Sequence, residues 1–195
     1  MEYTSSPMKD PKSYLTREQI QMLIDNAENE RDGLLLKFLS MTGRRVSEVV
    51  RRLKVGDIDF TQGLVNFFIE KRKTPTYSLL PIPESLLIEV KSYIERNNLK
   101  PDSFLWQISR QRVDQIIKSI AKKVGLLNVG IGKYNKIHIH LFRHSFAIQA
   151  SKVLKSPADL IQLKNILAHS RIETTMFYLK FNPTEQKELL KEMFG

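Results

Sequence analysis

Residues 57–82 interrupt a sequence whose hydrophobic pattern is otherwise helical. The runs DIDF, LVNFFIE and TYSLLPI are short and rich in β-branched and aromatic residues, and the segments TQG and KRKTP separate them. Short runs of this composition between turn segments predict antiparallel β-strands. The chain is therefore expected to be mainly α-helical with one small three-stranded antiparallel β-sheet, an α+β fold.

Helices are expected on both sides of this sheet. LTREQIQMLIDNA has an apolar stripe, and Thr16 with Gln19 makes a capping-box pattern at its start. RDGLLLKFLSMTG predicts a more buried helix that ends at Gly43, and RVSEVVRRL predicts a short helix directly after it. The later helices are expected at PESLLIEVKSYIERNN, SRQRVDQIIKSIAKKVG, IHLFRHSFAIQASKVL, SPADLIQLKNILAH, IETTMFYLK and NPTEQKELLKEMF, the last capped by Asn182.

The length of 195 residues fits one domain with a sizeable core. Residues 1–14 are expected to be a flexible leader and residues 15–195 the folded domain. The N-terminus has no apolar segment typical of a signal peptide, and no apolar run approaches the roughly 18 residues of a membrane span. The chain has no cysteine, which excludes disulfides and fits a reducing cytoplasm, the expected location.

The basic residues indicate a polyanionic partner. The formal net charge is +10 and the pI is about 9.7, and Lys and Arg occur in clusters. Nucleic acid is the favoured partner. The alternative is a soluble basic protein whose charge has no specific partner.

The segment HLFRH places His140, Arg143 and His144 on one helix face. Two histidines at this spacing could bind zinc, but Arg143 lies between them and the glutamate of a His-Glu-x-x-His site is absent. An anion site fits better, because Arg has a planar fork of donors and His exchanges protons near neutral pH. His144 is expected to be a hydrogen-bonded core residue rather than a metal ligand.

Two other segments could complete such a site. TGRRVSEVV has Arg44 and Arg45 at a helix start, where amide donors also favour anions. LAHSRIETTMFY has His169 and Tyr178 nine residues apart, or roughly 13 Å in one continuous helix. Those two side chains could share a pocket only if the chain turns near positions 170 and 171. Glu48, three residues after Arg45, is expected either to orient that helix or a catalytic partner, or to be an ordinary surface residue.

Together, TGRRVSE, a basic β-turn, HLFRH and LAHSRIETTMFY resemble the motifs, in the same order, of the catalytic domain of tyrosine recombinases, the group of phage integrases and Xer-type enzymes. The resemblance runs from about residue 16 to the C-terminus. Ala168 stands where the family usually has Gly, and Lys71 is the alternative to Lys73 in the turn. The residues that match the catalytic positions of the family are Arg45, Lys73, His140, Arg143, His169 and Tyr178.

The resemblance implies a site-specific DNA recombinase that cleaves and rejoins strands through a 3′-phosphotyrosyl intermediate, with no metal, ATP or other cofactor. It implies that Tyr178 is the nucleophile, that Arg45 and Arg143 hold the phosphate, and that His140 accepts or relays the tyrosine proton. His169 is expected to donate a hydrogen bond to a phosphate oxygen, and Lys73 to protonate the leaving 5′-oxygen.

The implied partner is double-stranded DNA, bound by a homotetramer that assembles on it from monomers or weak oligomers, at the nucleoid. The helix SRQRVDQIIK is expected to approach the major groove. Family members usually carry an N-terminal DNA-clamp domain, which is expected to be absent here, so the chain is either a minimal enzyme or a fragment. The residues expected to contact DNA are Arg44, Arg51, Arg52, Lys71, Arg110, Arg112 and Lys118.

Three other functions compete with this interpretation. SPADLIQLKNILAHSRIETTMFY could form a helix-turn-helix in a DNA-binding protein without catalytic activity. A type IB topoisomerase would use the same chemistry to relax supercoils. A metalloenzyme based on histidine would depend on a bound ion.

Overall fold

The computed structural model describes residues 14–69, 76–129, 136–179 and 191. The basic turn with Lys71 and Lys73 lies outside these ranges, as do the leader up to residue 13 and nearly all of the expected last helix. Within them the fold is mainly helical with one three-stranded antiparallel sheet, which confirms the predicted fold class.

The first two helices begin and end where the sequence predicts. Helix α1 (Arg17–Asp25) has the full capping box of Thr16 and Gln19. Helix α2 (Glu30–Thr42) is followed by Gly43, whose φ of +60° is left-handed. A Cβ atom on Gly43 would lie 2.4 Å from the Phe146 ring, so both the backbone and the packing require glycine here.

The sheet follows a short helix, α3 (Val46–Val50), and a 3₁₀ turn, η1 (Val55–Asp57). Its strands are β1 (Ile58–Asp59), β2 (Leu64–Ile69) and β3 (Thr76–Pro81), in the order β1-β2-β3. The central strand alternates between partly exposed residues and the buried Val65, Phe67 and Ile69, so one face of the sheet packs on the core. All three strands lie within the predicted runs.

Five helices complete the described fold, and the predicted N-cap of α7, Ser156, forms a capping box with Asp159. None of the helices in the described ranges is both long and apolar enough to cross a bilayer. The five helices are α4 (Glu84–Arg96), α5 (Arg110–Lys123), α6 (His140–Ser151), α7 (Pro157–Ile166) and α8 (Glu173–Leu179).

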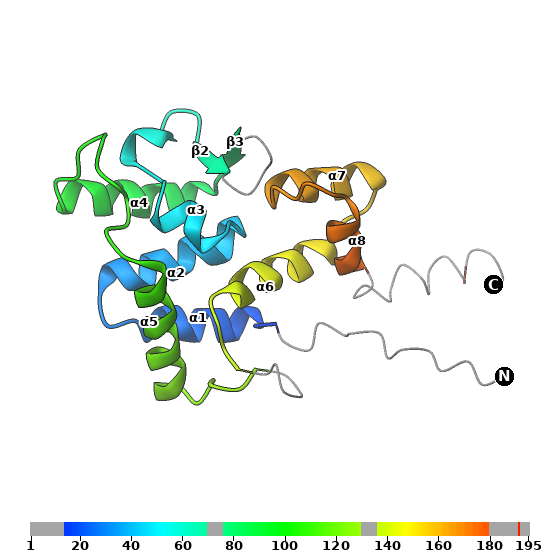
Figure 1. The fold of residues 1–195 in the computed structure, drawn as a ribbon, viewed down its shortest axis with the longest axis horizontal. Helices are drawn as coiled ribbons and strands as arrows, with labels where there is room; N and C mark the ends of the chain where they lie inside the picture. Colours follow the sequence, from blue (N-terminus) through cyan, green and yellow to red (C-terminus); the bar gives the residue numbers. More distant parts are fainter. Residues whose placement is uncertain (1–13, 70–75, 130–135, 180–190, 192–195) are drawn as a thin grey trace.

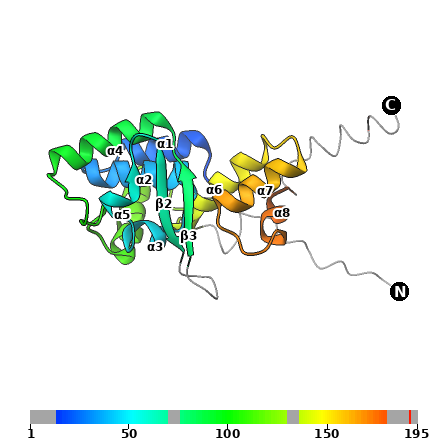
Figure 2. The ribbon, with the colours of Figure 1, turned by 90° about the horizontal axis from the view of Figure 1, so that it is seen from above.

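Helix α6 connects two hydrophobic cores. Its first turn contributes Leu141 and Phe142 to the large core shared with α1–α5 and the sheet. Its later residues Ala147 and Ile148 belong to a small core with α7 and Tyr178 of α8. Figures 1 and 2 both show α7 and α8 together at one end of the molecule, with α6 running from them toward α2. Arg143 and His144 therefore lie where the two cores meet.

Candidate active site around Tyr178

Arg143 joins three separate parts of the chain at the centre of this region. Its side chain is buried, and its two terminal nitrogens donate to the carbonyl of Gly43 at 2.8 Å and to that of Leu167 at 2.5 Å. Burial lowers its pKa to about 10, and the positive charge of Arg45 acts in the same direction. The guanidinium stays charged at neutral pH and has three further N–H groups for an anion.

Arg45 is held at the start of α3 by a buried carboxylate. Its NH1 lies 2.7 Å from Oε1 of Glu48, and its backbone N–H donates to Oε2 at 3.3 Å. Glu48 is 4% exposed. Its burial and its bonds to Arg45 favour the expected role of orienting a catalytic partner over that of an ordinary surface residue.

Arg44 does not fit its predicted contact with DNA. The residue is 1% exposed, its guanidinium stacks 4.6 Å from the centre of the Phe67 ring, and NH2 donates to Ser78 Oγ at 2.9 Å. Its side chain runs under the sheet because α3 starts directly after the sharp turn at Gly43. We therefore correct this prediction: Arg44 is a core residue, and Arg45 is the arginine beside Arg143.

The chain turns between α7 and α8. This turn is the condition under which His169 and Tyr178 can share one pocket. Ala168 has a φ of +49°, in the left-handed region that glycine adopts without strain. This backbone conformation gives a physical reason for a glycine at this motif position. The reversal buries His169 and brings α8 back against α6.

His169 is a buried, uncharged imidazole beside the two arginines. Burial lowers its pKa to about 4, and the charges of Arg143 and Arg45 add to the effect. Its Nδ1 lies 2.9 Å from the hydroxyl oxygen of Thr175, which is itself fully buried on α8. The ring is therefore fixed in orientation by the helix that carries Tyr178.

Tyr178 lies between two histidines. Its ring is parallel to that of His169, with 6.3 Å between the centroids and an angle of 7°. Its hydroxyl lies 2.9 Å from Nδ1 of His144 on α6. Burial raises the pKa of Tyr178, and the positive charge of Arg143 partly opposes this shift. The hydroxyl is thus protonated at neutral pH and needs an acceptor before it can act as a nucleophile.

The tyrosine hydroxyl contacts a histidine other than His140, the residue expected to accept or relay the tyrosine proton. The contact is made by His144, one turn further along α6. Nε2 of His140 lies 3.4 Å from NH2 of Arg110, at the start of α5. His144 is expected from the sequence to be a hydrogen-bonded core residue. Only its position four residues after His140, on the same helix face, indicates that it could contact Tyr178. Thr175 was not predicted at all.

The residues predicted to contact DNA, apart from Arg44, are exposed wherever they are described. Arg110 contacts His140, so the start of α5 lies next to the start of α6. Lys118 forms an ion pair with Asp114 at 2.5 Å, and the guanidinium of Arg52 lies over the Phe68 ring at 5.4 Å. Lys71, like the proposed catalytic Lys73, lies outside the described residues. The exposed residues of this set are Arg51, Arg52, Arg110, Arg112 and Lys118.

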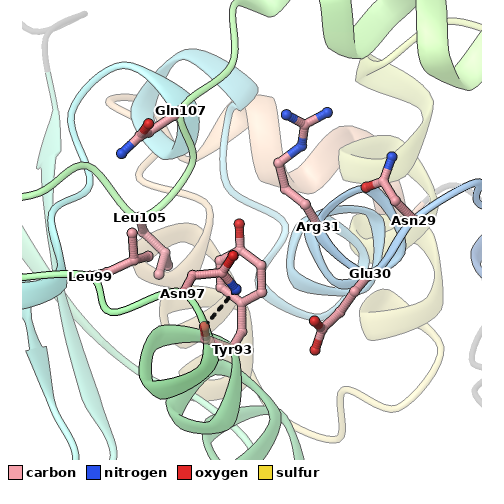
Figure 3. A pocket seen from close by; sticks show the side chains of 8 residues that line it. All are labelled: Asn29, Glu30, Arg31, Tyr93, Asn97, Leu99, Leu105 and Gln107. Atoms are coloured by element: carbon pink, nitrogen blue, oxygen red, sulfur yellow. Dashed lines mark hydrogen bonds between the residues drawn. The ribbon is translucent and has the colours of Figure 1, made fainter.

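A polar pocket, drawn in Figure 3, is lined by residues from the start of α2, the end of α4 and the loop after it, including Arg31, Tyr93 and Gln107. None of the predicted catalytic residues lines it. In the ranges that the structure describes, no three His, Asp or Glu side chains gather as metal ligands.

The sequence matches known proteins over nearly its whole length. The profile of the phage integrase family matches residues 13–185. The chain is 30% identical over 196 residues to tyrosine recombinase XerA of Pyrococcus furiosus and 28% identical over 194 residues to XerA of Pyrococcus horikoshii. Each match covers 95% of this chain but only 63% and 62% of those proteins, so the chain spans less than two thirds of these relatives.

Solved structures share the fold at low sequence identity. The crystal structure of XerA recombinase superposes with a TM-score of 0.69 at 22% identity, covering 93% of this chain and 65% of that one. A pre-cleavage complex of XerH site-specific recombinase bound to difH substrate gives 0.65 at 22%, covering 90% and 52%. The catalytic domain of bacteriophage HP1 integrase gives 0.65 at 22%, covering 92% of this chain and 94% of that domain.

Proposed function

The chain belongs to the phage integrase family, and from this premise we propose that it is a tyrosine-type site-specific DNA recombinase. The observation that carries the proposal is the meeting of Arg45, Arg143, His169 and Tyr178. These side chains come from three segments far apart in the sequence, and their charges act on one another. Two cations, a neutral imidazole and a tyrosine hydroxyl form a set suited to phosphoryl transfer.

In the proposed reaction, the Tyr178 oxygen attacks a DNA phosphorus and the bond from phosphorus to the 5′-oxygen breaks. The products are a 3′-phosphotyrosyl bond and a free 5′-hydroxyl. Rejoining reverses both changes, so the energy of the phosphodiester is kept and no ATP is consumed. The tyrosine hydroxyl loses one proton and the leaving 5′-oxygen gains one. The protein must therefore supply an acceptor for the first proton and a donor for the second.

Arg45 and Arg143 are proposed to bind the non-bridging phosphate oxygens, whose negative charge increases toward the transition state. Glu48 and the carbonyls of Gly43 and Leu167 hold the two guanidinium groups before DNA arrives. Such preorganisation reduces the rearrangement that the reaction requires.

His169 is proposed to donate a hydrogen bond from Nε2 to a phosphate oxygen. If the Thr175 hydroxyl donates to Nδ1, the single proton of the neutral ring lies on Nε2. Lys73 is proposed as the acid that protonates the 5′-oxygen, on the basis of the resemblance alone. His140, beside Arg110 at the end of α6 nearest α5, is proposed to contact the phosphate backbone.

Double-stranded DNA is the proposed partner, held by a basic surface of Arg51, Arg52, Arg110 and Arg112. We propose assembly of a homotetramer on two duplexes, from chains that are monomers or weak oligomers before binding, in the cytoplasm at the nucleoid. The net charge of +10 and the XerH complex with difH substrate support a DNA partner.

The test is capture of covalent adducts. The protein is incubated with a pool of duplexes of randomised sequence that carry a nick, so that a short fragment diffuses away after cleavage and traps the intermediate. An adduct that survives denaturing electrophoresis, disappears in Tyr178→Phe and persists in a chelator supports the proposal. Sequencing the captured strands then gives the target site.

The same assay separates the competing functions. DNA binding without an adduct would favour the helix-turn-helix protein. An adduct together with relaxation of supercoiled plasmid, but without exchange between two captured sites, would favour the topoisomerase. Loss of the adduct in chelator would favour the metalloenzyme.

A further inference from the structure

The contact between His144 and Tyr178 suggests a role for a residue outside the predicted catalytic set. His144 is on α6 and Tyr178 on α8, 34 residues later, yet Nδ1 and the hydroxyl oxygen are 2.9 Å apart. The geometry is that of a hydrogen bond along which a proton could pass. The inference that follows rests on the proposed function, since it concerns the step in which Tyr178 attacks DNA.

We propose that His144 is the general base that accepts the proton of Tyr178. As the bond between the tyrosine oxygen and phosphorus forms and the bond to the 5′-oxygen breaks, the hydroxyl proton moves to Nδ1 of His144. The 5′-oxygen receives its proton from Lys73, the acid already proposed. In rejoining, His144 returns its proton to the departing tyrosine oxygen.

Among the described residues, two other candidate acceptors, Glu48 and His169, are engaged or badly oriented. The carboxylate of Glu48 is bound to Arg45 through both its oxygens. His169 lies parallel to the tyrosine ring, and the lone pairs of an imidazole lie in the plane of its own ring, so they do not point at a stacked partner. Its Nδ1 is also bound to Thr175. His144, inclined at 49° to the tyrosine ring, points a nitrogen at the hydroxyl.

The charges around His144 favour its neutral form, the form that can accept a proton. Burial lowers its pKa from 6.5, and the nearby His138 and Arg143 lower it further. The titratable and charged groups that face it are Tyr178 from α8, His169 from the loop before α8, Arg143 from α6 and His138 from the segment before α6. The Nδ1 lone pair is available when the ring proton is on Nε2.

The decisive variant is His144→Asn, because the amide oxygen can occupy the place of Nδ1 and accept the hydrogen bond but cannot take up the proton. The rate of adduct formation is measured in single turnover on nicked DNA captured by the wild-type protein, between pH 5 and 9. We expect the wild-type rate to fall in acid as His144 is protonated and to be level above pH 7. His144→Asn should be about 10²- to 10⁴-fold slower, with a rate that rises with pH up to 9.

Two further measurements test the transfer of the proton itself. Added imidazole should restore part of the rate of His144→Ala, since it can take the vacant place and the proton. Replacing Tyr178 by 3-fluorotyrosine, whose hydroxyl is more acidic, should reduce the loss caused by His144→Asn. Thermal melting and DNA binding confirm that each variant is folded.

The proposal is overturned if His144→Asn forms adduct at the wild-type rate with the wild-type pH profile, because the histidine then only positions the tyrosine. It is also overturned if folded His144→Ala is slow and imidazole has no effect. If the wild-type protein itself forms no adduct with any DNA, the proposed function fails, and the role of His144 fails with it.

Discussion

The hydroxyl of Thr175 lies 2.9 Å from Nδ1 of His169, and both residues are buried. Thr175 is three residues before Tyr178, so one short helix carries the proposed nucleophile and fixes the orientation of the proposed phosphate ligand. A shift of α8 would therefore move both groups together.

The first prediction concerns this hydroxyl. Thr175→Val keeps the shape of the side chain but removes the hydroxyl that we propose as the donor to His169, so adduct formation should fall by about 10- to 100-fold. Thr175→Ser keeps the hydroxyl and should retain most of the rate. Single-turnover adduct assays compare the two. Equal rates for Thr175→Val and the wild-type protein would show that the hydrogen bond has no part in the reaction.

The second prediction concerns Glu48. Glu48→Gln removes the charge that holds Arg45, leaving a cation with 19% of its side chain exposed and only a neutral partner. We expect the free energy of unfolding to fall by about 1–3 kcal/mol and adduct formation to fall as well. Urea unfolding and the adduct assay measure the two effects. Glu89→Gln, which breaks the more exposed ion pair with Lys37, is the matched control and should have little effect on either.

The third prediction concerns Gly43. Ala at this position combines a left-handed φ with a Cβ that would meet the Phe146 ring. The expected loss of stability is about 2–4 kcal/mol, measured by urea unfolding. Because Arg143 donates to the carbonyl of this residue, adduct formation should decrease too. Gly125→Ala also has a left-handed φ but meets nothing within 4 Å, so it isolates the backbone strain and should cost less.

The fourth prediction distinguishes the exposed Arg112 from the buried Arg44 by their effects on DNA binding. Each phosphate contact makes the slope of log binding constant against log salt concentration more negative by about 0.9. Arg112→Ala removes an exposed cation of α5 and should reduce the magnitude of this slope by about 0.9. Arg44→Met removes a buried cation and should leave the slope unchanged. A slope of smaller magnitude for Arg44→Met would show that Arg44 contacts DNA.

The fifth prediction is the pH dependence of stability. The folded pKa of His169 is about 4, below the ordinary value of 6.5, so the unfolded chain binds the proton more readily between these values. The contribution of His169 is complete above pH 6.5 and is lost as the pH falls toward 4, on the order of 2–3 kcal/mol. His144 acts in the same direction. Urea unfolding of His169→Gln should show a shallower loss across this window.

Local patterns in the sequence predicted the elements and most of the site. The capping box at Thr16 and the stop at Gly43 depend on neighbours in the chain, and both are where the sequence predicts them. The meeting of Arg45, Arg143, His169 and Tyr178 was inferred from the motifs, because their order in the chain follows that of a known family.

What the sequence did not reveal concerns contacts between distant segments. Nothing in TGRRVSE distinguishes a buried Arg44 from an exposed one, because its burial depends on Phe67 and Ser78 of the sheet. Likewise, His140 and His144 share a helix face, and only the angle at which α8 returns to α6 selects His144 as the partner of Tyr178. Thr175 could not be found from spacing alone, since its partner lies across the turn at Ala168.

The most direct test of the central claim is to identify the residue joined to DNA. The trapped adduct is digested with protease and nuclease, and the peptide that carries the nucleotide is sequenced by mass spectrometry. The account predicts that the tryptic peptide of residues 172–180 carries a 3′-phosphodiester on Tyr178. A nucleotide on any other tyrosine, such as Tyr77 or Tyr134, or a 5′-linkage, would contradict it.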